Sequence, residues 1–260
     1  AKAGLSLPVP RIGCGEEEQG PCLTRFRVGV QAPLRLRIID RGEQQDGLLR
    51  EEDWDEVGDY LKVVRFVEYG RPDEPLYGRV GELGPVTVGH GTVVNSYYNV
   101  VTPDHFRLGV RTSANTQYGG GELLLNDVAK PGLVGGRAYV RPWSFVDPEG
   151  WLTRLAIGTT VMGDVSAPFR LARGAGQQPI VGAARFPEVE RRQGTWIGGL
   201  DVELAVVDSK VFTLTPYTDF NVHFGLGSGL HSGLLADVRP IEKLGFSTRL
   251  EYRLMSSDYL

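Results

Sequence analysis

The sequence predicts an all-β protein, specifically an antiparallel up-and-down transmembrane β-barrel. Three observations favour this class. Apolar and polar residues alternate over long segments, as they do in strands with two different faces. Glycine accounts for 35 of the 260 residues, nearly twice the usual share of about 7%, and is spread along these segments. Finally, no apolar run exceeds four residues, whereas a membrane helix needs about 20 and a barrel strand only about 9–11 with one apolar face.

The clearest predicted strand lies near the C-terminus, over residues 246–254. Its apolar face would hold Phe246, Thr248, Leu250, Tyr252 and Leu254, because alternate residues of a strand point to opposite sides. Similar alternation predicts strands over 151–161, 196–206 and 212–224. These strands are longer than the five or six residues typical of soluble proteins, which is the usual pattern of outer-membrane barrels.

Shorter and less regular alternation predicts eight strands in the first part of the chain. They cover residues 23–31, 34–40, 60–69, 76–83, 86–94, 104–111, 119–126 and 134–146. The region 54–69 also fits helical spacing at its start. We expect about 12–14 strands in total.

The predicted connections sort into two kinds along the chain. Tight turns are expected at Gly84–Pro85, 147–150, 208–210 and 240–244, and counting strands up and down places all four at one end of the sheet. Longer connections at 95–104, 164–194 and 225–230 fall at the other end. Outer-membrane barrels have short turns at one end and long loops at the other, whereas a soluble sandwich has no reason to separate them.

The strand count raises the expectation that the barrel is incomplete in this chain. The tally is about 13, whereas bacterial single-chain barrels have even numbers. The last strand would also run toward the long-loop end, and the terminal Ser-Ser-Asp-Tyr-Leu lacks a final aromatic residue. Either a strand is missing or the count is wrong by one.

The N-terminal segment, residues 1–22, is separated from the barrel domain, residues 23–260. Cys14 and Cys22 bracket a polar, turn-rich stretch, which predicts a disulfide and an oxidising compartment. Two unpaired thiols are the alternative. Metal binding is disfavoured because two cysteines without a nearby histidine make a poor site.

The chain resembles bacterial outer-membrane β-barrel proteins of the porin-like kind over residues 60–260. The resemblance depends on the two-sided strands, on the loop asymmetry and on aromatic residues at strand ends: Tyr77, Trp143, Trp151, Trp196, Tyr217 and Tyr252. It implies the outer membrane of a Gram-negative bacterium as the location. The resemblance indicates a class of proteins and not a named family, so it assigns no functional role to any residue of this chain.

Charged residues alternate with the apolar ones and are expected to point into the enclosed interior. These lumen-lining candidates are Arg107, Arg111, Arg137, Arg141, Arg154, Asp201, Glu203, Asp219, Arg249, Glu251 and Arg253. Rings of charge set the ion preference of a pore, whereas opposite charges on neighbouring strands brace a sheet. Both interpretations stay open.

Catalytic, metal and cofactor sites are not predicted. The histidines His90, His105, His223 and His231 show no spacing that assembles a nucleophile with its base, and no G-x-S-x-G motif is present. Eight acidic residues between Glu43 and Asp59 lack a calcium-loop spacing and fit a solvated loop. The formal net charge of −4 disfavours a nucleic-acid partner.

Three functions are consistent with the sequence. The first is a porin-like channel or transport-associated barrel without catalysis, with outer-membrane lipid and small solutes or ions as partners. The second is a plugged structural or assembly barrel that acts with other envelope proteins, its interior filled by the segment 164–194 or by the N-terminal segment. The third is a soluble, secreted β-sandwich that binds a ligand.

Overall fold

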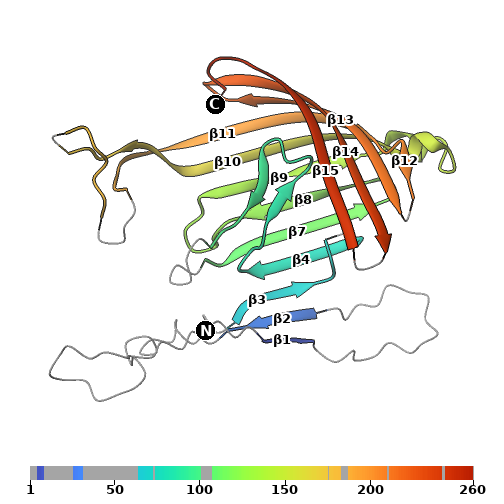
Figure 1. Ribbon diagram of the computed structural model, residues 1–260, viewed down its shortest axis with the longest axis horizontal. Coiled ribbons are helices and arrows are strands. Elements are labelled where there is room, and N and C mark those ends of the chain that lie inside the picture. Colours follow the sequence, from blue (N-terminus) through green and yellow to red (C-terminus); the bar gives the residue numbers. More distant parts are fainter. Residues whose placement is uncertain are drawn as a thin grey trace.

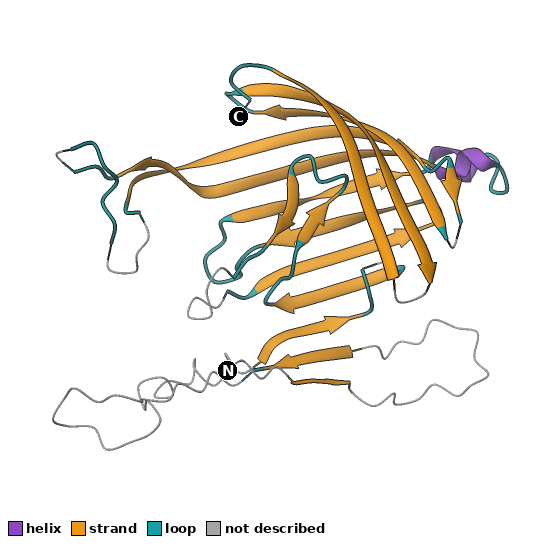
Figure 2. Cartoon of the chain, viewed as in Figure 1, coloured by secondary structure: helices purple, strands orange, loops and turns teal. Residues whose placement is uncertain are grey.

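The computed structural model describes residues 5–8 (as a strand only), 26–31, 64–72, 74–100, 107–174, 176–182, 187–209, 211–241 and 244–259. The predicted strand 34–40, the acidic segment 43–59 and the cysteines Cys14 and Cys22 lie outside these residues. The described part is all-β (Figure 2). Among its residues, no helix is long and apolar enough to cross a membrane.

One antiparallel sheet dominates the molecule. Its strands follow one another in space as β1 (Leu5–Pro8), β2 (Phe26–Val30), β3 (Val64–Tyr69), β4 (Leu76–Gly81), β7 (Gly109–Thr116), β8 (Gly119–Leu125), β9 (Leu133–Val140), β10 (Leu155–Leu171), β11 (Val189–Leu204), β13 (Phe212–His223), β14 (Gly227–Ile241) and β15 (Leu244–Met255). The short β12 (Val207–Asp208) pairs with β13. This order is the up-and-down sequence that the alternation predicts.

The sheet curls into a deep trough, with β13, β14 and β15 arching over its concave side (Figure 1). In the described residues, β1 pairs only with β2 and β15 only with β14, so the two edges do not meet. The strands β10 and β11 extend beyond their neighbours. Past Asp164 and before Ile197 they pair only with each other and form a projecting arm.

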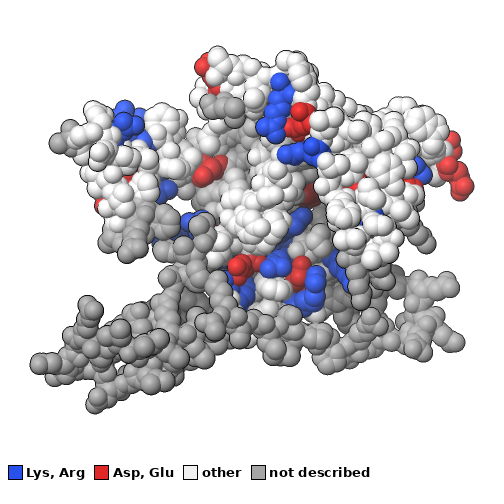
Figure 3. Space-filling model, in the orientation of Figure 1, with Lys and Arg blue, Asp and Glu red and all other residues white. Residues whose placement is uncertain are grey.

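The two faces of the sheet differ sharply in chemistry. Large apolar side chains on the convex face are exposed, among them Leu200, Phe220 and Leu250. Their sequence neighbours Asp201 and Asp219 are buried on the concave face. Charged groups are visible in the middle of the face seen in Figure 3, and others lie on its left lobe and at its right end. The predicted alternation of the C-terminal strands is confirmed.

A small hairpin occupies the concave side. Its strands β5 (Val86–Val88) and β6 (Val94–Tyr97) pair with each other and not with the sheet, although they lie between β4 and β7 in the sequence. Leu83, Val86, Val88 and Val94 of this region are buried against Leu124 and Met162 of the sheet wall. The hydrophobic core of the described residues therefore lies inside the trough, and the hairpin completes it (Figure 1).

The prediction of a wall strand over 86–94 is therefore wrong, and so is a tight turn at Gly84–Pro85. The alternation of Val86 and Val88 is real, but it faces the interior of the trough instead of one side of a wall. Gly89 and Gly91 have φ values of 55° and 77°, which end β5 after three residues. The connection from β4 to β7 lies at the same end as the one from β10 to β11, whereas the connection from β9 to β10, residues 141–154, lies at the opposite end, where only a tight turn was expected.

Four other predicted boundaries are corrected. The strand predicted over 134–146 ends at Val140, because Pro142 fixes φ and starts a 3₁₀ helix, η2 (Pro142–Phe145). The predicted start at Trp151 is a second 3₁₀ helix, η3 (Trp151–Arg154). The strands β10 and β11 reach far into the predicted loop 164–194, and β14 begins within the predicted loop 225–230.

Candidate functional site

The tip of the hairpin places one histidine at the centre of the trough. Gly89 and Gly91 flank His90 in a left-handed backbone conformation that glycine adopts without strain. A Cβ at Gly89 would lie 2.8 Å from Cδ of Arg137, so a larger residue would push the tip away from the wall. The His90 side chain is only 2% exposed. The sequence Gly-His-Gly thus forms a tight tip that places the His90 side chain in the interior of the trough.

His90 bridges two strands of the wall. Its Nδ1 lies 2.7 Å from Oδ1 of Asp219 on β13, and its Nε2 lies 2.6 Å from Oε2 of Glu203 on β11. The ring stacks on Tyr217, with 4.3 Å between the centroids. Burial alone lowers the pKa of His90, but the two carboxylates outweigh it and raise the pKa to about 9. His90 is therefore an imidazolium that donates from both nitrogens at neutral pH.

A buried ion pair lies beside the histidine. Arg137 on β9 donates from Nε to Oδ2 of Asp201 at 3.1 Å and from Nη2 to Oδ1 at 2.5 Å. Its Nη2 is also 3.5 Å from Oε1 of Glu203. The side chains of Arg137 and Asp201 are both 5% exposed. Such a pair stabilises only when its geometry is good and its remaining polar atoms are satisfied, and this two-pronged contact meets that condition.

Four further hydrogen bonds hold the tip. Thr92 donates to Oδ2 of Asp219 at 2.7 Å and accepts from the Asn221 amide at 3.1 Å. Arg249 of β15 donates to the carbonyl oxygen of His90 at 2.7 Å. The backbone N–H of Gly89 reaches Oε1 of Glu122 on β8 at 3.3 Å. The hairpin is thus bound to strands that span most of the width of the sheet.

Asn99 holds the base of the hairpin in a similar way. Its Oδ1 accepts from the backbone N–H of Leu83 at 2.7 Å. Its Nδ2 lies within 3.2 Å of three backbone carbonyl oxygens, those of Gly81, Arg107 and Asn126. Asn99 is 1% exposed. The hairpin is therefore anchored at both ends, by a polar tip and by an amide at its base.

His90, Asp201 and Asp219 lie close enough together to suggest a metal site. Their ligand atoms, however, already bind each other, Arg137 and Thr92. The adjoining cavity of about 10 Å³ has room for about one water molecule. We therefore interpret the cluster as an ion-pair network.

The structure places all eleven lumen-lining candidates around the concave side or at its two ends. Arg137, Asp201, Glu203, Asp219 and Arg249 meet at the hairpin tip. Glu251 accepts hydrogen bonds from Tyr217 and Arg253, and Arg111 lies 5.4 Å from the ring of Tyr77. Arg107, Arg141 and Arg154 line cavities at the ends, and Arg154 belongs to a 3₁₀ helix instead of a strand.

Sequence reasoning missed two groups of the site. The sequence predicts a wall strand over 86–94 and therefore does not place His90 at the centre of the interior. The two glycines that flank His90 are the signal that could have indicated a hairpin tip. A second cluster joins Glu68 to Tyr77, Arg27 and Arg79, with the Tyr77 hydroxyl donating to Glu68 at 2.8 Å. Its members come from three short strands, and nothing in their spacing predicts the contact.

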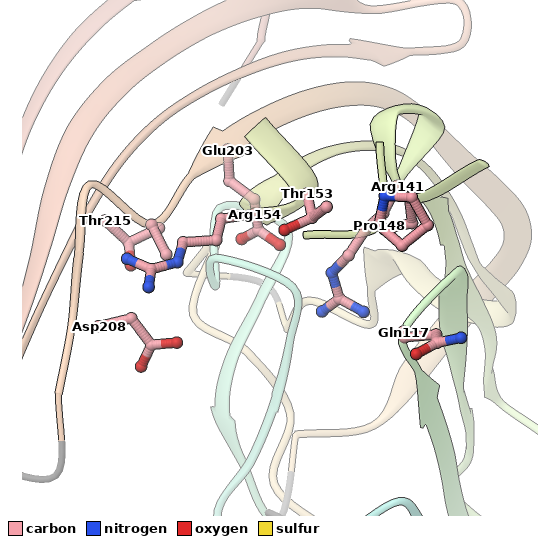
Figure 4. A pocket seen from close by; sticks show the side chains of 10 residues that line it. Gln117, Arg141, Pro148, Thr153, Arg154, Glu203, Asp208 and Thr215 are labelled. Atoms are coloured by element: carbon pink, nitrogen blue, oxygen red, sulfur yellow. The ribbon is translucent and has the colours of Figure 1, made fainter. Parts of the chain in front are cut away.

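Open cavities flank the hairpin at the two ends of the trough. One of about 640 Å³ is lined by Arg107, Lys130 and Arg192 together with Asp127 and Asp164. The other, of about 350 Å³, lies at the end that carries η2, η3 and β12 (Figure 4). Beside the network lies a chamber of about 10 Å³.

This arrangement can hold a hairpin inside a curled sheet and separate two polar cavities. The concave side holds the charged network and the apolar core around the hairpin, whereas the convex face exposes large apolar side chains. No protein-family model matches the chain, and no curated protein or solved structure matches it either.

Proposed function

We propose that the chain is a transmembrane β-barrel of the outer membrane of a Gram-negative bacterium, with its interior closed by the hairpin Val86–Tyr97. The observation that carries the proposal is the reversed distribution of side chains. Leu200 is 64% exposed and Leu250 is 75% exposed on the convex face, whereas Arg137 and Asp201 are buried inside. A protein in water has the opposite preference, whereas in hydrocarbon this distribution is the favourable one.

Closure of the barrel is part of the proposal. Each neighbouring pair along the twelve-strand path is antiparallel, so β1 and β15 run in opposite directions and have the polarity needed to pair. An open edge would leave backbone N–H and C=O groups unpaired in the bilayer, which costs several kcal/mol for each group. A bilayer therefore favours the closed form.

The hairpin favours the plugged form of the barrel over an open porin-like channel. Of the two plug segments expected from the sequence, 164–194 contributes to the projecting arm of β10 and β11, and most of the N-terminal segment lies outside the described residues. The proposed plug comes from the connection between β4 and β7 and is held by His90, Thr92 and Asn99. The proposal gives the chain a structural or assembly role with envelope partners and assigns it no catalysis.

A gated passage for small solutes or ions is a second candidate function. The favouring observation is the pair of polar cavities, of about 350 and 640 Å³, on either side of the hairpin. In this candidate function, we expect a passage between them to open when the tip is displaced.

Partition of the full chain between water and lipid tests the proposal. The protein would be refolded from urea into detergent and then into phosphatidylcholine vesicles. We expect it to float with the vesicles after a carbonate wash and to show heat-dependent mobility in dodecyl sulfate gels. A chain that stays monodisperse in buffer without detergent, and does not float, would instead support the soluble β-sandwich.

A further inference from the structure

The cavity of about 350 Å³ has the chemistry of a ligand site. It lies between η2 and η3, the turn after β7, and the segment that holds β12. Its volume falls at the small end of the range for ligand pockets, about 300–1,000 Å³. A solute of roughly 10–15 heavy atoms would fit. None of the eleven lumen-lining candidates was predicted to form such a pocket.

Two arginines from different elements line this cavity; Figure 4 shows Arg154 directed toward the side of Thr215 and Asp208, and the Arg141 guanidinium apart from it on the side of Gln117. Arg141 follows β9, and its Nη1 donates to Oδ1 of Asn115 at 3.0 Å, which fixes the direction of the guanidinium. Its charge also lies 5.1 Å from the ring of Tyr139. Arg154 ends η3 on the other side of the cavity. Within the described part of the chain, neither arginine makes an ion pair.

The carboxylates of the cavity do not cancel these charges. Glu203 lines the cavity, but its two oxygens already contact His90 and Arg137. Asp208 on β12 lines the rim and is the remaining acid. With Glu203 engaged in the network, the lining holds two guanidinium groups and one remaining carboxylate, which leaves one positive charge in excess.

Neutral polar groups complete the lining. Gln117, Ser144, Thr153 and Thr215 surround the two arginines. The hydroxyl of Thr153 donates to the carbonyl oxygen of Gly150 at 2.7 Å, so its oxygen remains free to accept. The Gln117 amide offers both a donor and an acceptor. Guanidinium forks match planar oxyanions, and the surrounding groups suit hydroxyls on the same ligand.

We infer that this cavity binds a small, hydroxylated solute bearing an oxyanion, with Arg141 and Arg154 as the two basic residues of its lining. Carboxylate and phosphate share this chemistry. The site shares Glu203 with the network that holds the hairpin, so the ligand lies next to the plug. The inference goes beyond the proposed function and does not require the membrane.

Calorimetric titration of the full chain in detergent tests the inference. The probes are citrate and inorganic phosphate, each at low ionic strength, and a stronger response to one of them identifies the preferred oxyanion. We expect saturable binding of at least one probe. Arg154→Gln should weaken it about tenfold or more, because it removes a charged hydrogen-bond partner, while Arg154→Lys should retain part of it. Arg154 is exposed and ends a 3₁₀ turn, so these variants should fold.

Arg170→Gln is the matched control, since Arg170 lies on the projecting arm and its side chain is 64% exposed. It should leave binding unchanged. If neither probe binds, or if Arg170→Gln weakens binding as much as Arg154→Gln does, the inference is overturned. Flotation with vesicles tests the proposed function separately, so the two can fail independently.

Discussion

At the scale of single residues, the charge on His90 makes the structure sensitive to pH. The folded pKa of about 9 lies above the ordinary 6.5, which corresponds to roughly 3 kcal/mol. The stabilisation is complete below pH 6.5 and is lost as the pH rises through 9. Urea unfolding in detergent should therefore show His90→Gln to be less stable than the original chain by up to that amount at pH 6, with the gap narrowing by pH 10.

The same substitution at His223, which contacts Thr195, serves as the control for the pH effect. The difference in free energy of unfolding between His223→Gln and the original chain should not follow the pH dependence expected for His90→Gln between pH 6 and pH 10. If the deficit of His90→Gln were equal at pH 6 and pH 10, the charged bridge to Asp219 and Glu203 would be wrong.

Glycine supplies a second test at this scale. Gly135 in β9 has a φ of 153°, and a Cβ there would lie 2.1 Å from the carbonyl oxygen of Val161. Gly135→Ala should lower the free energy of unfolding by roughly 2–4 kcal/mol, through strain and backbone clash. Gly78→Ala in β4 meets nothing within 4 Å and should be neutral or slightly stabilising. Equal stability of the two variants would contradict this packing.

At the scale of elements, the sequence predicts long strands well and short ones poorly. Alternation over 196–206 and 212–224 fixes which side chains share a face, because a one-residue slip would turn every charge outward. For the hairpin Val86–Tyr97, alternation alone does not predict the correct position. Val86 and Val88 alternate like wall residues, and only the tertiary contacts with Leu124 and Met162 show that they face inward. The site could be predicted as a set of inward charges, but not as a network centred on His90.

The hairpin should decide whether the proposed barrel conducts. Replacing residues 87–96 by Gly-Gly keeps Leu83 and Asn99 at the base and removes His90 and Thr92. Planar-bilayer recordings should show little conductance for the original chain and clear, stepwise conductance for this variant. Shortening the projecting arm instead, by removing residues 176–182, should leave conductance low.

A reversible version of this test uses a crosslink between the hairpin and the wall. Thr92 and Asn221 are in hydrogen-bond contact, so Thr92→Cys with Asn221→Cys, in a Cys14→Ser and Cys22→Ser background, should form a disulfide that holds the tip. If the Gly-Gly variant does not conduct, the gated passage is wrong. A passage that opens only after reduction of the crosslink would favour the gate.

At the scale of the whole molecule, the exposed apolar side chains of the convex face are favourable or unfavourable according to the solvent that contacts them. Leu200 lies near the middle of the paired part of β11, opposite Phe220, and both are exposed. In water, Leu200→Arg would change stability by less than about 0.5 kcal/mol, as exposed substitutions usually do. In a bilayer, arginine near the midplane costs about 2–4 kcal/mol. The same change therefore has two different expected outcomes, which depend only on the solvent.

We expect Leu200→Arg to lower the yield of vesicle-inserted protein and its free energy of unfolding in lipid by about 2–4 kcal/mol. Val146→Arg is the control, because Val146 is 82% exposed in the turn beyond η2, away from the strands. It should insert normally, since an interfacial arginine costs only about 0–1 kcal/mol. Two variants that behave alike in lipid would remove the membrane as the reason for the exposed face. A deficit confined to Leu200→Arg would place hydrocarbon against β11.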